Sequence, residues 1–170
     1  MKYFNGFSLQ HEECFFKAYL LENDYTVAGF SYGAQKAFEY VYESTERVDR
    51  LILISPAFFQ NAKKSFIRAQ LQYFQRDNEG YMKQFLESVA SPSNIALSDY
   101  FYPGDYEALL ALLGYTWDAL KVREVLKRGT VIEVFLGEQD KIIDASAALD
   151  FFKEICPTYF VKNVGHILQG

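Results

Sequence analysis

The chain has 170 residues, half of them hydrophobic, and a formal net charge of −5. This length can bury most of the unfolded surface around one core, so the sequence predicts a single domain over residues 1–170. The acidic balance excludes a general nucleic-acid binder, because neutralising phosphates requires a dominant basic face. No apolar run approaches the roughly 20 residues of a membrane span, and we expect no membrane partner.

Cysteine and histidine are scarce. Cys14 and Cys156 lie in no CxxC motif or Cys/His cluster, and the N-terminus lacks the apolar stretch of a secretory signal, so we expect a reducing, cytoplasmic location. With only His11 and His166 available, the sequence predicts no metal site and no cofactor. We interpret His11, ahead of a predicted helix start, as structural or exposed.

Five short β-rich runs alternate with helical patterns. They are Lys2–Phe4, Tyr25–Ala28, Leu51–Ile54, Val131–Leu136 and Tyr159–Val161. This alternation is typical of a parallel sheet with crossover helices, which predicts an α/β fold with about five mainly parallel strands. The third and fourth runs are almost continuously apolar, as central strands covered on both faces should be.

The segment between the third and fourth runs has no strand signal. Apolar residues repeat there at helical spacing, for example at Met82, Phe85, Leu86 and Val89. We therefore predict a helical cap over residues 57–128, inserted between core segments 1–56 and 129–170.

Gly29–Gly33 fits the pattern GxSxG, with Ser31 at its centre. The motif lies between the strand Tyr25–Ala28 and a helix predicted from Ala34, where a sharp turn exposes a nucleophilic serine. Glycines are needed where a Cβ would strike a neighbouring element. The same turn aims the Tyr32 N–H at a developing oxyanion. An ordinary strand-to-helix turn is the alternative interpretation.

A nucleophilic serine needs a base and an acid that orients it. His166 follows the last predicted strand and Asp140 the fourth, so both lie with Ser31 at the carboxyl edge of the sheet. The chain order Ser, Asp, His also accompanies GxSxG. Asp144 competes with Asp140, but its place before Ala145–Ala148 predicts a helix cap. Each residue alone also fits ordinary packing or turn chemistry; together they predict a catalytic triad.

A second oxyanion donor is expected in the loop after the first strand. Asn5, Gly6 and Phe7 follow that strand at the correct edge, so the Phe7 N–H is the candidate. Gly6 either lets the backbone approach the substrate or serves as a plain turn glycine.

These motifs together resemble the α/β-hydrolase superfamily. The segments Phe4–Phe7, Gly29–Ala37, Ile132–Asp140 and Gly165–Gln169 are most similar to the short pimeloyl-[acyl-carrier protein] methyl ester esterases of biotin synthesis. The resemblance covers the catalytic loops and most of the sheet, and the cap only in length and helical character. It implies a minimal α/β-hydrolase that removes the methyl ester from the ω end of a pimeloyl chain on acyl carrier protein.

The resemblance also implies roles for individual residues. Ser31, Asp140 and His166 match the triad positions, and Phe7 and Tyr32 match the oxyanion positions. Compared with larger hydrolases, the segment from Gly6 to Ser31 has room for only one helix, which leaves Lys2–Phe4 as an edge strand open to self-association. The oligomeric state stays open.

Acyl carrier protein is the implied partner, and the sequence contains a basic segment that suits it. Residues 57–76 include Lys63, Lys64 and Arg68 but no acidic residue. Lys64 and Arg68 are four residues apart and so share a helix face, free to meet an acidic carrier. These three residues are the candidate carrier-binding set, and a plain solvated face is the alternative.

Two other functions remain open. One is a different serine acyl hydrolase, a thioesterase or small-ester carboxylesterase, since pocket shape decides between such substrates. The other is a non-catalytic binding module, whose sequence sign would be a missing triad residue; none is missing. Aromatic residues of the cap either wall an acyl tunnel or form the cap's own core; they are Phe58, Phe59, Phe101, Tyr102 and Trp117.

Overall fold

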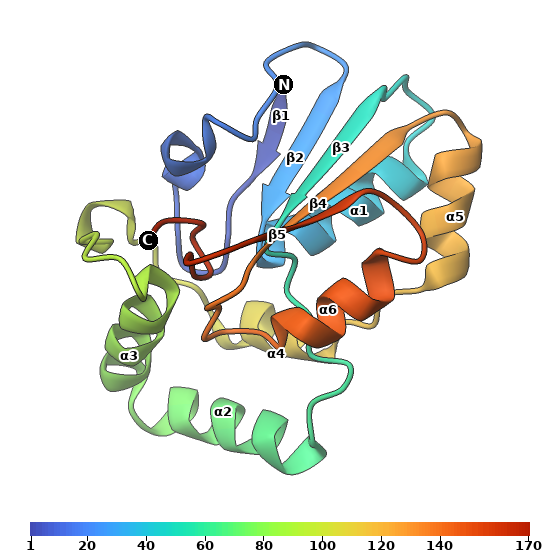
Figure 1. Ribbon diagram of the computed structural model, residues 1–170. Helices are drawn as coiled ribbons and strands as arrows, with labels where there is room; N and C mark the ends of the chain where they lie inside the picture. Colours follow the sequence, from blue (N-terminus) through green and yellow to red (C-terminus); the bar gives the residue numbers. More distant parts are fainter.

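The computed structural model describes residues 1–170 and contains one five-stranded sheet (Figure 1). The strands are β1 (Lys2–Phe4), β2 (Thr26–Phe30), β3 (Arg50–Ile54), β4 (Val131–Gly137) and β5 (Thr158–Val161). They lie in the order β1-β2-β3-β4-β5 and every neighbouring pair is parallel. The predicted α/β class and its five strands are confirmed, and β1 is an edge strand as expected.

Three helices cover one face of the sheet. They are α1 (Tyr32–Glu43), α5 (Ala119–Lys127) and α6 (Ala145–Phe152). The residues of one apolar face of α1 are all buried: Ala34, Ala37, Phe38 and Val41. They share a core with Leu51, Leu53, Ile132 and Val134 of the sheet, with Val122 and Val125 of α5, and with Ala148 and Phe152 of α6. These helices and this face of the sheet therefore form one continuous core.

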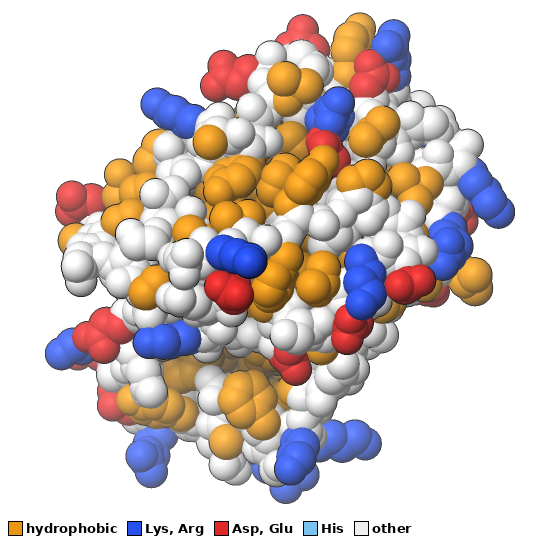
Figure 2. Space-filling model, in the orientation of Figure 1, with side chains coloured by type: hydrophobic (Ala, Val, Ile, Leu, Met, Phe, Trp, Pro, Cys, Tyr) orange, Lys and Arg blue, Asp and Glu red, His pale blue; other side chains and the backbone are white.

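The opposite face is covered by shorter segments. The 3-10 helix η1 (Glu12–Phe16) packs on β2, with the Phe16 and Phe30 rings 4.9 Å apart. No helix covers this face of β4, where Val131 is 44% exposed and Glu133 forms an ion pair with Arg50. The prediction that β4 is covered on both faces is therefore wrong for its outward residues. Figure 2 shows hydrophobic side chains gathered over the strands on this side.

The connection from β3 to β4 contains helices and loops but no strand. The helices are α2 (Lys64–Arg76), α3 (Asn78–Ala90), η2 (Ser98–Tyr100), α4 (Tyr106–Gly114) and then α5. α2 packs against α3 and α4, and these helices lie beyond the carboxyl ends of the strands (Figure 1). α5 instead packs on α1, where Lys121 pairs with Glu39. α5 falls within the residues 57–128 predicted as cap, and it is the helix that returns the chain to β4.

None of the helices combines the length and the apolar character needed to cross a membrane.

Candidate active site

The loops that follow the five strands bring one residue each to a common edge of the sheet. Phe7 follows β1, Ser31 follows β2, Ser55 follows β3, Asp140 follows β4 and His166 follows β5. Parallel strands place all of their carboxyl ends at the same edge, which is where ligands bind in open α/β sheets. This edge faces α2, α3 and α4.

Ser31 occupies a strained turn between β2 and α1. Its φ of 54° and ψ of −115° lie outside the regions that residues with a side chain ordinarily adopt, at a cost of about 1–3 kcal/mol. Backbone hydrogen bonds hold the turn: the Ser31 N–H donates to Ile54 at 2.9 Å, and the Ala57 N–H donates to the Ser31 carbonyl at 3.1 Å. A Cβ on Gly29 or Gly33 would strike adjacent backbone, so the turn requires both glycines.

A chain of hydrogen bonds joins Ser31, His166 and Asp140. The His166 Nε2 lies 2.9 Å from the Ser31 Oγ, and Nδ1 lies 2.6 Å from the Asp140 Oδ2. The other Asp140 oxygen accepts from the Ile142 and Ile143 N–H groups at 2.7 and 3.1 Å. With Asp140 held as an acceptor, the imidazole carries its proton on Nδ1, which leaves Nε2 free to take the proton of the serine.

Two further groups hold the imidazole in place. The buried Ser55 hydroxyl donates to the backbone carbonyl of His166 at 2.6 Å, and the Phe30 ring packs on the imidazole with centroids 4.9 Å apart. Neither residue carries a sequence signal for this role. A serine directly after a buried strand matches no motif, and Phe30 looks like any core aromatic.

The competing titratable residues lie elsewhere. The Asp144 carboxylate accepts from the Ala147 N–H at 3.0 Å at the start of α6, so its predicted capping role is confirmed. His11 is exposed, as predicted. Cys14 and Cys156 are both free thiols. No group of three or more His, Cys, Asp or Glu side chains is close enough to form a metal site.

The two predicted oxyanion donors are unpaired. Neither the Phe7 N–H nor the Tyr32 N–H donates a hydrogen bond within the chain. Tyr32 opens α1, where the first N–H groups of a helix point outward and carry partial positive charge. Two free N–H donors in the loops that follow β1 and β2 suit an anionic oxygen.

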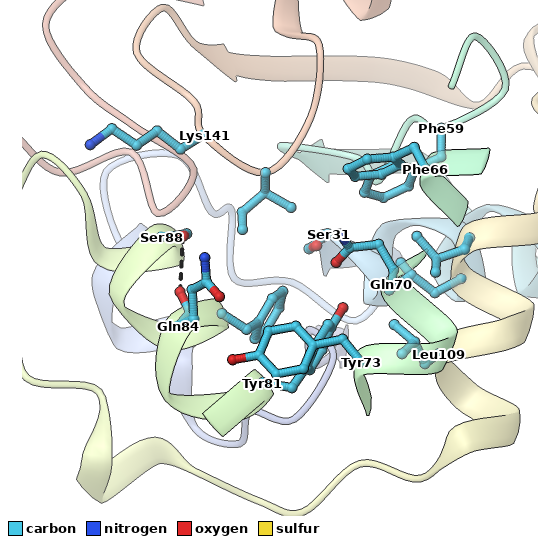
Figure 3. A pocket seen from close by; sticks show the side chains of 14 residues that line it. Ser31, Phe59, Phe66, Gln70, Tyr73, Tyr81, Gln84, Ser88, Leu109 and Lys141 are labelled. Carbon is cyan, nitrogen blue, oxygen red and sulfur yellow. Dashed lines mark hydrogen bonds between the residues drawn. The ribbon is translucent and has the colours of Figure 1, made fainter. Parts of the chain in front are cut away.

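A cavity of about 290 Å³ opens at Ser31 beneath α2, α3 and α4 (Figure 3). Nine of its fourteen lining residues are hydrophobic, which suits an apolar acyl chain. Figure 3 shows the amides of Gln70 and Gln84 turned into the space between the helices. Burial raises the pKa of Tyr81 to about 12, so this phenol stays neutral. Lys141 is the only charged residue of the lining.

Of the two alternatives for the cap aromatics, an acyl tunnel wall or a core, the core holds for Phe58 and Trp117. Of the five aromatic residues, only Phe59 lines the cavity. Trp117 is buried and donates from Nε1 to the Ala57 carbonyl at 2.9 Å, Phe58 packs on Phe152, and Tyr102 is 60% exposed. Trp117 and Phe58 therefore belong to the core. The polar lining residues were missed because a glutamine on a helix normally indicates solvent.

The predicted basic segment lies on the surface of α2. Lys63, Lys64 and Arg68 are exposed, and none of them takes part in an ion pair. The opposite face of α2 packs on the core through Ile67, Leu71 and Phe74, with the Phe74 and Phe7 ring centroids 6.3 Å apart. Figure 2 shows Lys and Arg side chains along the lower edge, over α2.

No protein-family model and no curated protein sequence matches the chain. Solved structures do match it. Carboxylesterase NP from Bacillus subtilis, a naproxen esterase, is 19% identical with a TM-score of 0.58, over 84% of this chain and 53% of that protein. The esterase EaEST from Exiguobacterium antarcticum is 20% identical with a TM-score of 0.62, over 83% and 59%.

The chain has the α/β-hydrolase fold. E-2-(acetamidomethylene)succinate hydrolase extends the likeness over nearly the whole chain, with 13% identity, a TM-score of 0.60, and coverage of 98% of this chain and 84% of that protein. The chain spans only about half of the length of other matched proteins, 53% of carboxylesterase NP and 54% of a putative hydrolase from Bacillus subtilis. At such identities the likeness concerns the fold, and the chemistry has to be argued from the site.

Proposed function

We propose that the protein is a serine carboxylic ester hydrolase. The observation that carries this proposal is the hydrogen-bonded chain from Ser31 through His166 to Asp140, with Ser31 held in a strained turn at an apolar cavity. A serine hydroxyl becomes a useful nucleophile only beside a base of this kind. A packing histidine would not need its two ring nitrogens matched to a serine and a buried carboxylate.

The proposed reaction proceeds in two halves. The Ser31 Oγ attacks the ester carbonyl while the His166 Nε2 takes its proton, and Asp140 stabilises the resulting imidazolium. The N–H groups of Phe7 and Tyr32 bind the negative oxygen of the tetrahedral intermediate. His166 then protonates the departing alcohol. Water repeats the sequence on the acyl-enzyme, releases the acid and restores Ser31.

The proposed substrate is the methyl ester of pimeloyl-[acyl-carrier protein], in biotin precursor synthesis. The cavity is near the lower end of the roughly 300–1,000 Å³ of small-molecule sites, so it suits a short or medium acyl chain. Apart from Lys141, the lining is uncharged, which favours an ester over a free carboxylate at the reacting end, because an unpaired charge is costly to bury. The exposed basic residues of α2 support a carrier-bound substrate.

The substrate assignment is tested by incubating the protein with the carrier-bound methyl ester and following the mobility of the carrier. The unmethylated pimeloyl carrier and a simple acyl-carrier thioester serve as controls. We expect the methyl ester to be cleaved and the thioester to remain intact. Cleavage of the thioester alone would make the protein a thioesterase, and cleavage of neither would exclude carrier substrates.

Carrier docking on α2 predicts a second result. We expect Lys64→Glu with Arg68→Glu to lower kcat/KM for the carrier-bound ester and to weaken its salt dependence, while p-nitrophenyl butyrate hydrolysis stays unchanged. Steering between exposed charges fades as the screening length falls from about 10 Å at 0.1 M salt to about 3 Å at 1 M. Chemistry inside the cavity is much less sensitive to salt.

A matched control exists on α5. Arg123 and Lys127 are also exposed and four residues apart, but α5 packs on α1, away from α2. Their double reversal to Glu makes the same change in net charge. Equal losses from the two pairs would assign the effect to net charge and contradict docking on α2. A loss on both substrates would indicate a damaged fold.

A further inference from the structure

Glu12 is a buried acid outside the triad. Its side chain is 0% exposed and forms no ion pair. Oε1 accepts from the Gly6 N–H at 2.7 Å and from the Tyr3 hydroxyl at 3.3 Å, whereas Oε2 has no partner. A buried carboxyl oxygen without a partner costs free energy, so packing alone does not explain a glutamate at this position. The position therefore calls for a role besides packing.

The contact that Glu12 makes lies next to the proposed oxyanion donor. Gly6 immediately precedes Phe7, and glycine has more backbone freedom than any other residue. On its other side the loop is tied to the cap, since the Gly104 N–H donates to the Ser8 hydroxyl at 3.0 Å and the Tyr102 N–H to the Ser8 carbonyl at 3.1 Å. On the Gly6 side, the Gly6 N–H is held by Glu12 at 2.7 Å, and the Gly6 carbonyl accepts from the Leu9 N–H at 3.3 Å.

We propose that Glu12 is a positioning residue of the oxyanion site: by holding the Gly6 N–H, it fixes the direction of the Phe7 N–H. The inference rests on the proposed esterase function. Burial raises the pKa of the Glu12 carboxyl, which favours the neutral acid. The carboxyl group accepts from the Gly6 N–H through Oε1 in either protonation state.

The test compares two substitutions of similar size, Glu12→Met and Glu12→Gln. Met removes the acceptor and leaves the buried Gly6 N–H without a partner, which we expect to lower the stability of this variant, so thermal melting accompanies the kinetics. Gln keeps an oxygen for the Gly6 N–H. We expect Met to lower kcat for p-nitrophenyl butyrate by about 10-fold to 100-fold, less than the 10²–10³-fold of losing a donor outright. The KM of the Met variant should change by less than about twofold. The kcat of the Gln variant should stay within about threefold of wild type.

Tyr3→Phe is the matched control, because it removes a partner of Glu12 and leaves the bond to Gly6. We expect its kcat to equal that of wild type. If Glu12→Met does not fold, Glu12→Asp replaces it, since the carboxyl group then falls short of Gly6 by one methylene. A stable Met or Asp variant with wild-type kcat would overturn the proposal, as would a Gln variant as slow as Met.

The two proposals fail in different ways. If wild type hydrolyses no ester and Ser31 is unreactive, the esterase function itself is wrong. If wild type is active, Ser31→Ala is inactive and Glu12→Met retains full kcat, only the role of Glu12 is wrong.

Discussion

We expect Ser31→Ala to lower kcat for p-nitrophenyl butyrate by about 10⁶-fold, the loss typical when a triad nucleophile is removed. The reason is that no other hydroxyl lies within reach of the His166 Nε2, which contacts Ser31 at 2.9 Å. Folding should be preserved, because Ala removes only an oxygen. Initial rates and thermal melting of the purified variant check both expectations.

Ser88 provides a matched control for this experiment. It also lines the cavity, but its hydroxyl donates to the Gln84 backbone carbonyl at 2.9 Å and contacts no base. We expect Ser88→Ala to change kcat by less than about twofold. If Ser31→Ala keeps its activity, or if Ser88→Ala loses as much, Ser31 is not the nucleophile.

The second large effect separates two aspartates that lie four residues apart. We expect Asp140→Asn to lower kcat by about 10⁴-fold with folding intact, because the amide stabilises the wrong imidazole tautomer. Asp144→Ala should leave kcat unchanged and cost about 1 kcal/mol of stability, the usual loss for a helix cap. The structural basis is that Asp140 lies 2.6 Å from His166, while Asp144 binds only the start of α6.

The experiment needs kinetics and melting on the same preparations. A slow Asp144→Ala enzyme beside an active Asp140→Asn enzyme would mean that the acid has been assigned wrongly. A loss of stability in Asp140→Asn would mean instead that Asp140 acts mainly in folding, through its bonds to the Ile142 and Ile143 N–H groups.

The fold and the three residues of the hydrogen-bonded chain could be predicted because their signals are local. Apolar runs identified the strands, and GxSxG placed Ser31 at a strand-to-helix turn. Parallel topology then required Asp140 and His166 to reach the same edge, since both follow strands. Asp144 was recognised as a cap from the helix pattern that follows it.

The remaining features depend on contacts between distant segments. The roles of Glu12 and Ser55 follow from bonds to Gly6 and to the His166 carbonyl, and no spacing in the sequence signals such bonds. The cavity lining depends on how α2, α3 and α4 pack together, so Gln70 and Gln84 were missed. The sequence does not separate α5 from the cap helices, because its apolar face looks the same whether it packs on the cap or on the sheet.

The nucleophile is tested most directly by reacting the protein with a fluorophosphonate and locating the adduct by peptide mass spectrometry. In this reaction the serine oxygen bonds to phosphorus, fluoride leaves and His166 takes the serine proton. We predict one adduct per chain, on Ser31, and none after Ser31→Ala. A wild-type protein that forms no adduct, or forms it on another residue, would contradict the assignment of this site as a serine hydrolase centre.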